Sequence, residues 1–159
     1  MELKLDNKKV YAVALEGGGA KGAYEVGAWK ALEEAGGKYN AVSGTSVGAL
    51  NGAMMVMRDM DRAVKCWMDI RLSKVIDVDP EEEEELRKMF RGEIELSDIH
   101  GLIPQVFDII RNRGLDVAPL RAWLREAVDE RRIKESDVEF FVSTVSITDR
   151  KALEIKIND

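Results

Sequence analysis

Two hydrophobic patterns alternate along this chain, and they predict strands and helices in turn. Tyr11–Leu15 is a continuous apolar run, which is typical of a parallel strand covered on both faces. A helical pattern follows at 21–35 and ends at Gly36 and Gly37, a pair suited to the left-handed C-terminal cap. A short strand then leads into a helix at 47–57, which is apolar on most sides but too short to span a bilayer.

In the rest of the chain several predicted helices come first and a pair of predicted strands comes last. Further helices and strands are predicted at 59–70, from Asp79 onward, at 119–130, at 139–148 and at 151–157, the last two forming a hairpin. In the helix at 59–70 the apolar residues recur at helical spacing and are expected in the core: Met60, Ala63, Val64, Trp67 and Met68. The apolar segment at 89–110 is expected either to pack in the core or to form a helical flap over a site.

A candidate nucleophile stands between the second strand and its helix. Gly44, Thr45, Ser46, Val47 and Gly48 have the pattern G-x-S-x-G, and we call these residues the elbow. In a sharp turn, side chains two positions before and after the serine would clash, which favours glycine at both. Ser46 would then be exposed above the N-terminus of a helix, where partial positive charge favours a developing anion. An ordinary Gly/Ser turn is the alternative.

A glycine-rich segment follows the first predicted strand. It contains Gly17, Gly18, Gly19, Lys21 and Gly22, and we call residues 17–22 the glycine loop. Glycines leave backbone N–H groups bare, which fits either a phosphate cradle or an oxyanion hole. A dinucleotide site needs an acidic residue at the end of the second strand, where this chain has the elbow. Lys21 is expected to support the loop or contact an anionic head group, or else to be an ordinary exposed lysine.

The positions of these two motifs predict that they meet. Open α/β folds place their sites at the carboxyl edge of the sheet, and both motifs follow predicted parallel strands. In order and spacing the glycine loop and the elbow resemble the signature of the patatin-like phospholipases, and a weaker similarity continues through 114–120 and 138–148. The resemblance implies a three-layer α/β/α fold with a mainly parallel sheet, in a single domain of which residues 1–159 form the N-terminal portion.

The same resemblance implies the chemistry of a serine acyl hydrolase. Members of that family hydrolyse acyl esters, usually of lipids, with a serine and an aspartate and without histidine. Ser46 would be the nucleophile, and the glycine loop, including Gly17, Lys21 and Gly22, would form the oxyanion hole. The substrate would be a lipid or another acyl ester, met in transient contact with a membrane surface. The resemblance implies neither a metal nor a cofactor.

The family's catalytic aspartate has no match in this sequence. It lies in a later Asp-Gly-Gly or Asp-Gly-Ala motif, and the chain contains neither. Asp116, Asp149 and Asp159 are not followed by glycine, and each fits a loop, turn or chain-end role. His100, the only histidine, is interpreted as a surface or loop residue, because a hydrolase triad usually places histidine late, after the acid. We therefore expect a fold that is incomplete at its C-terminus and a chain with little or no activity by itself.

Composition limits the classes of binding partner and the cellular compartment that we expect for this chain. The formal net charge of −6 leaves no basic stripe to offset repulsion from phosphates, which argues against nucleic acid. The single cysteine, Cys66, excludes an internal disulfide and fits a reducing compartment. The N-terminus has no secretory pattern, so the cytoplasm is the expected location. The oligomeric state stays open, and a non-catalytic lipid- or nucleotide-binding module is the alternative function.

Overall fold

The computed structural model describes Lys9, residues 11–70 and residues 118–158. By its internal contacts the chain divides into two compact units, one made of 1–69 with 127–159 and the other of 70–126. Several sequence predictions lie outside the described residues: the helix from Asp79, the segment at 89–110, His100, Asp116 and Asp159.

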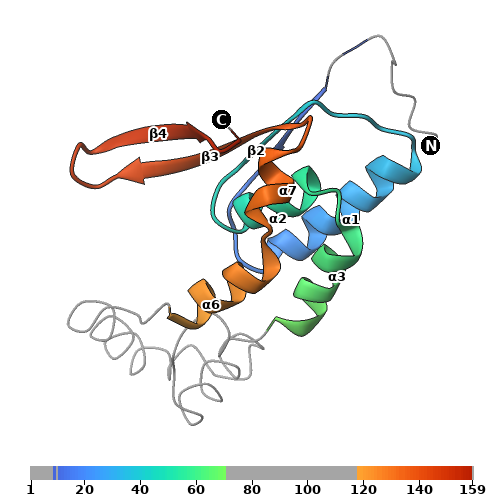
Figure 1. Cartoon of the computed structure of the whole chain (residues 1–159), viewed down its shortest axis with the longest axis horizontal. Coiled ribbons are helices and arrows are strands. Elements are labelled where there is room, and N and C mark those ends of the chain that lie inside the picture. The colour runs from blue at the N-terminus through green and yellow to red at the C-terminus, as the bar shows by residue number, and fades with distance from the viewer. Residues whose placement is uncertain (1–8, 10, 71–117, 159) are drawn as a thin grey trace, which may run out of the picture. The chain divides into compact units, whose positions relative to one another are not determined.

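A four-stranded sheet in the order β1-β2-β3-β4 forms the frame of the first unit (Figure 1). Its strands are β1 (Ala12–Leu15), β2 (Ala41–Gly44), β3 (Glu139–Ser146) and β4 (Lys151–Lys156). The first three strands are parallel, and β4 pairs antiparallel with β3 as the second arm of a hairpin. The predicted α/β fold with a mainly parallel sheet is thereby confirmed.

Helices separate the parallel strands along the chain, as the sequence pattern predicts. They are α1 (Lys21–Glu34), α2 (Val47–Val56), α3 (Met60–Asp69), α6 (Ala118–Ala127) and α7 (Glu130–Lys134). Within the first unit α2 packs on β1, β2 and β3, and α1 and α3 pack on α2 (Figure 1). Gly36 has a φ of 72°, so α1 ends in the predicted left-handed cap. Among the described helices, none has the length and apolar character needed to cross a bilayer.

Helix α2 approaches the sheet closely at Gly52, where a larger residue would not fit. A Cβ atom at Gly52 would lie 2.8 Å from Cε2 of Phe140 and 3.2 Å from Cγ1 of Val42. Phe140 and Val42 are register partners on adjacent parallel strands, so they present one apolar face to the helix. Helix α2, strand β2 and the residue just before β3 supply the most deeply buried side chains: Val42, Asn51, Met54, Met55, Val56 and Val138. The contact holds α2, and the elbow that precedes it, firmly against the sheet.

The helix predicted at 119–130 is wrong in its C-terminal part, because two helices share that segment. Helix α6 ends at Ala127, and α7 starts at Glu130. Asp129 between them is extended, and its carboxylate accepts hydrogen bonds from the backbone N–H groups of Arg131 and Arg132 at 3.0 and 3.2 Å. An N-cap of this kind starts a new helix and therefore interrupts the old one.

Two burial predictions are also wrong in part. Of the apolar stripe on α3, Ala63 is buried, whereas Val64 is 41% and Met68 82% exposed. Helix α3 therefore turns a narrower face to its neighbours than the stripe suggested. In β1, which was expected to be covered on both faces, Ala12 and Ala14 are exposed. The helix that packs on this strand, α2, covers the opposite face, where Val13 and Val42 are register partners.

Candidate active site

The elbow is a strained turn between β2 and α2. Ser46 has φ 55° and ψ −123°, a region that costs a non-glycine residue about 1–3 kcal/mol. Its side chain is exposed. A Cβ atom at Gly44 would lie only 2.3 Å from the carbonyl oxygen of Gly48, so the turn closes only with glycine at this position. The elbow therefore presents the Ser46 hydroxyl to solvent at the carboxyl end of β2.

The same turn is fixed to the end of the neighbouring strand. The backbone N–H of Thr45 donates a hydrogen bond to the carbonyl of Leu15 at 3.2 Å. A Cβ atom at Gly48 would lie 2.6 Å from the carbonyl oxygens of both Leu15 and Glu16. Since Leu15 ends β1 and Glu16 leads into the glycine loop, the first turn of α2 rests on the start of that loop.

The glycine loop passes directly beside the serine. A Cβ atom at Gly17 would lie 3.2 Å from Cβ of Ser46. Gly18 and Gly19 then adopt φ values of 151° and 56°, which side chains rarely tolerate. The loop and the elbow thus meet at the carboxyl edge of the sheet, in the arrangement that their positions after parallel strands predicted.

Backbone N–H groups at this edge lack partners. The carbonyls of Gly18 and Gly19 accept hydrogen bonds from the N–H groups of Lys21 and Gly22 at 3.2 and 3.1 Å. Within the described part of the chain, however, the N–H groups of Gly18 and Gly19 donate none. Val47 begins α2, so its N–H has no acceptor within the helix. These donors and the positive end of the helix dipole favour a negatively charged atom next to Ser46.

Comparison with known proteins assigns the chain to a family. The family model described as patatin-like phospholipase matches residues 13–157. The chain belongs to this family. Lysophospholipase nte1 of Aspergillus terreus is 53% identical over 49 residues, which are 31% of this chain and 3% of that protein.

A solved structure supports the fold. The structure of VipD from Legionella pneumophila has a TM-score of 0.53 and 16% identity over 92% of this chain. The match spans 39% of the VipD chain, and at this identity it shows the fold alone. Both matches cover only a fraction of the relatives' own length.

Lys21 lies along the glycine loop of this patatin-like chain. A Cβ atom at Gly18 would lie 2.9 Å from Cδ of Lys21, so the lysine stem occupies the space that a side chain at 18 would need. The ammonium is 3.7 Å from the carboxylate of Glu16, and both side chains are exposed. Such an exposed ion pair contributes little stability, so Lys21 can exchange Glu16 for another anion.

No general base contacts the serine among residues 9, 11–70 and 118–158, where Ser46 Oγ makes no hydrogen bond. Asp149, one of the aspartates considered above, lies in the turn between β3 and β4. It accepts a hydrogen bond from the hydroxyl of Ser146 at 3.0 Å, while its own N–H donates to that hydroxyl. These bonds give Asp149 the role of a turn residue.

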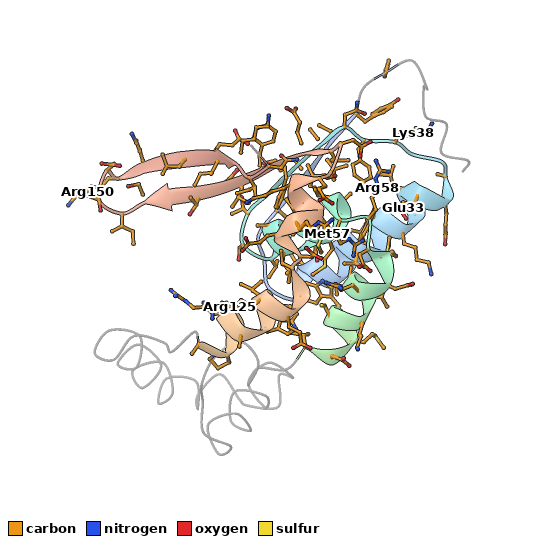
Figure 2. The ribbon with its side chains drawn as sticks, viewed as in Figure 1. Glu33, Lys38, Met57, Arg58, Arg125 and Arg150 are labelled. Carbon is orange, nitrogen blue, oxygen red and sulfur yellow. The ribbon has the colours of Figure 1, made fainter. Side chains whose placement is uncertain are left out.

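A cavity of about 480 Å³ lies at the opposite edge of the sheet. Its lining includes Tyr39 and Asn40 just before β2 and Asp137 just before β3, so it opens at the amino ends of these strands. Arg58 and Glu33, labelled in Figure 2, also line it. This cavity is therefore separate from the Ser46 site, which is open to solvent.

Sequence reasoning missed one residue next to the site. Asn51 follows the elbow on α2 and is 2% exposed, within an otherwise apolar run. It connects α2 to the end of the glycine loop through its side-chain amide. An amide inside such a run was the available signal, since buried polar groups nearly always have hydrogen-bond partners.

Proposed function

We propose that this chain carries the nucleophile and the oxyanion-binding half of a serine acyl hydrolase that acts on lipid esters. The observation that supports this most directly is the close approach of Gly17 to the exposed Ser46, since the next two residues of the loop carry N–H groups without partners among the described residues. Family membership supports a lipid hydrolase. The local match to a lysophospholipase supports lipid esters as the substrate class.

In the proposed reaction Ser46 Oγ attacks the carbonyl carbon of an acyl ester. Its proton passes to a carboxylate base, a C–O bond forms, and the carbonyl electrons move onto oxygen. The N–H groups of Gly18, Gly19 and Val47 stabilise that oxyanion, each such donor contributing on the order of 3 kcal/mol in comparable sites. Collapse of the tetrahedral intermediate releases the alcohol, which takes up the proton. Water then attacks the acyl-enzyme by the same steps and frees the fatty acid and Ser46.

The base is proposed to be an aspartate from outside these 159 residues. Serine at its ordinary pKa is a poor nucleophile without an adjacent base. Ser46 has no such partner among the described residues, and the sequence contains no Asp-Gly pair. On this proposal, residues 1–159 form the N-terminal portion of one patatin-like domain. The reading frame beyond Asp159 tests this point, because an Asp-Gly-Gly or Asp-Gly-Ala motif is expected there.

Turnover and labelling together test the proposal. The chain is incubated with a short-chain nitrophenyl ester, and separately with an excess of a long-chain alkyl fluorophosphonate. We expect turnover at the level of the buffer, but slow covalent labelling at one site, which mass spectrometry assigns to Ser46. Ser46→Ala should abolish the label. Ser43→Ala is the matched control, since Ser43 lies on β2 and its hydroxyl donates to Glu154 at 3.2 Å.

The other outcomes each exclude part of the proposal. Robust ester turnover that Ser46→Ala abolishes would place a base within the chain. Lipid retention without any labelling of Ser46 would favour the non-catalytic lipid-binding alternative. A gain in thermal stability with a dinucleotide would favour the nucleotide-binding alternative, which the hydrolase proposal does not predict.

A further inference from the structure

Asn51 is a polar side chain buried in an apolar environment, which indicates a specific structural role. It is the one polar side chain that is buried among the described residues, and its neighbours along α2 are apolar. A buried amide is stable only when its hydrogen-bonding groups have partners. The hydrogen-bond partners of Asn51 therefore indicate which part of the backbone it holds in place.

Three hydrogen bonds determine the orientation of this amide. Nδ2 donates to the carbonyl of Gly22 at 2.9 Å and to the carboxylate of Glu25 at 2.8 Å. Oδ1 accepts from Nε1 of Trp67 at 2.8 Å. Because both N–H groups and the oxygen are engaged, the amide has one favourable orientation. We call Asn51 with Gly22, Glu25 and Trp67 the amide clamp.

The clamp acts on the backbone of the glycine loop. Gly22 is the last residue of that loop and lies in the first turn of α1. A Cβ atom at Gly22 would lie 2.3 Å from Cζ2 of Trp67 and 3.1 Å from Nδ2 of Asn51. The loop can therefore reach the clamp only with glycine at this position, and its backbone is held against α2 and α3.

Both ends of the glycine loop are consequently attached to the elbow and its helix. At the start, Thr45 donates to Leu15, and Gly48 packs on the same carbonyl. At the end, Asn51 donates to Gly22. The unpaired N–H groups of Gly18 and Gly19 lie between these two attachments. The contacts of the loop with the elbow and α2 therefore fix the position of these groups relative to Ser46.

We propose that Asn51 is a positioning residue that keeps the amides of the glycine loop in register with Ser46. The inference rests on the proposed role of Ser46 as a nucleophile. It adds that the loop geometry depends on the bond from Asn51 to Gly22.

Paired substitutions separate positioning from folding. Asn51→Asp has nearly the same shape but lacks both N–H donors and sets a carboxylate against Glu25. Adding Glu25→Gln removes that repulsion and supplies a donor to Asp, so the fold recovers while the bond to Gly22 stays broken. Glu25→Gln alone is the matched control, since its amide oxygen still accepts from Nδ2 of Asn51 and the bond from Asn51 to Gly22 is kept.

Two measurements are made on the 159-residue chain and each variant. The first records the backbone amide NMR chemical shifts of Gly18 and Gly19 and the hydrogen-exchange rates of these amides. The second is inactivation by a long-chain alkyl fluorophosphonate, resolved into kinact and KI. We expect the Asn51→Asp/Glu25→Gln variant to lower kinact on the order of tenfold to a hundredfold, with KI within about twofold. Its Gly18 and Gly19 resonances should shift, whereas Glu25→Gln alone should leave both measurements nearly unchanged.

The results distinguish this inference from the proposed function. A folded Asn51→Asp/Glu25→Gln variant with unchanged kinact and unchanged loop resonances overturns the positioning role. If the parent chain is never labelled at Ser46, the proposed function fails, and the NMR measurement alone decides whether Asn51 holds the loop. Equal effects of Glu25→Gln alone and the double variant would reduce Asn51 to a structural residue and also overturn the inference.

Discussion

The two ends of α2 differ sharply in how their backbone groups are satisfied. At the C-terminal end three successive carbonyls accept side-chain hydrogen bonds. Met55 accepts from the hydroxyl of Tyr39, Val56 from that of Ser136, and Met57 from the guanidinium of Arg132. At the N-terminal end Ser46 makes no capping bond, the first turn has no acidic residue, and the backbone is strained.

Both ends of a helix leave orphan groups, and most proteins satisfy them with caps. Among the described residues, side chains bind the last carbonyls of α2, whereas no side chain caps its N-terminal end. There only the N–H groups of Gly48 and Ala49 have backbone acceptors. On the proposed function, the C-terminal end serves stability and the N-terminal end is kept open for an anion. The following predictions test this contrast, from the largest expected effect to the smallest.

Gly48→Ala tests the backbone contact at the open end. Its Cβ atom would lie 2.6 Å from two backbone carbonyl oxygens, which cannot rotate away. We expect a loss of about 3 kcal/mol in the free energy of unfolding, measured by urea denaturation. Gly27→Ala is the control, since no atom lies within 4 Å of its Cβ position, and it should stabilise α1 by about 1 kcal/mol. Equal effects of the two changes would contradict the close approach of elbow and loop.

Arg132→Met tests the satisfied end. The guanidinium of Arg132 donates to the carbonyl of Met57 and also pairs with the carboxylate of Asp59. Both partners would lose a charged donor, so we expect a loss of about 2 kcal/mol in urea denaturation. Arg131→Met, which removes only an exposed pair with Glu135, should cost less than about 0.5 kcal/mol. A similar loss of unfolding free energy in Arg132→Met and Arg131→Met would show that the bonds at the C-terminal end of α2 add no stability beyond that of an exposed ion pair.

Ser46→Gly measures the strain of the elbow. Glycine tolerates a φ of 55°, so the change should raise the free energy of unfolding by about 1 kcal/mol, even though glycine has more freedom in the unfolded chain. Ser46→Ala keeps the strain and should leave stability nearly unchanged. Both variants remove the hydroxyl, so both should lose the fluorophosphonate label. A lower free energy of unfolding for Ser46→Gly would show that the backbone at Ser46 is not strained.

The acid sensitivity of the satisfied end comes from Asp59. Partial burial raises its pKa, but the hydrogen bonds and charges of Arg132 and Arg62 outweigh burial, and the net pKa is lowered. A carboxyl whose pKa is lower in the folded state stabilises the fold above its unfolded pKa, and this stability is lost as the pH falls through the folded pKa. The stability difference between the parent chain and Asp59→Asn should therefore be largest near neutrality and shrink below about pH 4. Parallel pH profiles would contradict this assignment.

Local signals in the sequence predicted most of the frame. The apolar run at Tyr11–Leu15, the glycine pair after α1 and the turn between β3 and β4 each specify their element through nearby residues. The meeting of elbow and glycine loop was also predictable, because parallel strands bring their carboxyl ends to one edge. The break between α6 and α7 was missed because the cap at Asp129 interrupts an otherwise continuous helical pattern.

Contacts between distant residues could not be predicted in the same way. The pairing of Asn51 with Trp67 and Gly22 depends on how three helices cross. The donors to the last carbonyls of α2 come from before β2 and from α7, far away in sequence. The exposure of Met68 likewise depends on how narrow a face α3 buries, which periodicity alone does not specify.

The most direct test of the central claim is the amide spectrum of the chain before and after a fluorophosphonate modifies Ser46. The phosphonyl oxygen of the adduct occupies the place of the oxyanion. If the unpaired amides of the loop face that place, the Gly18 and Gly19 amide protons should move downfield and become protected from exchange. An adduct on Ser46 that leaves both resonances unchanged would contradict the claim that this edge of the sheet is built to hold an anion.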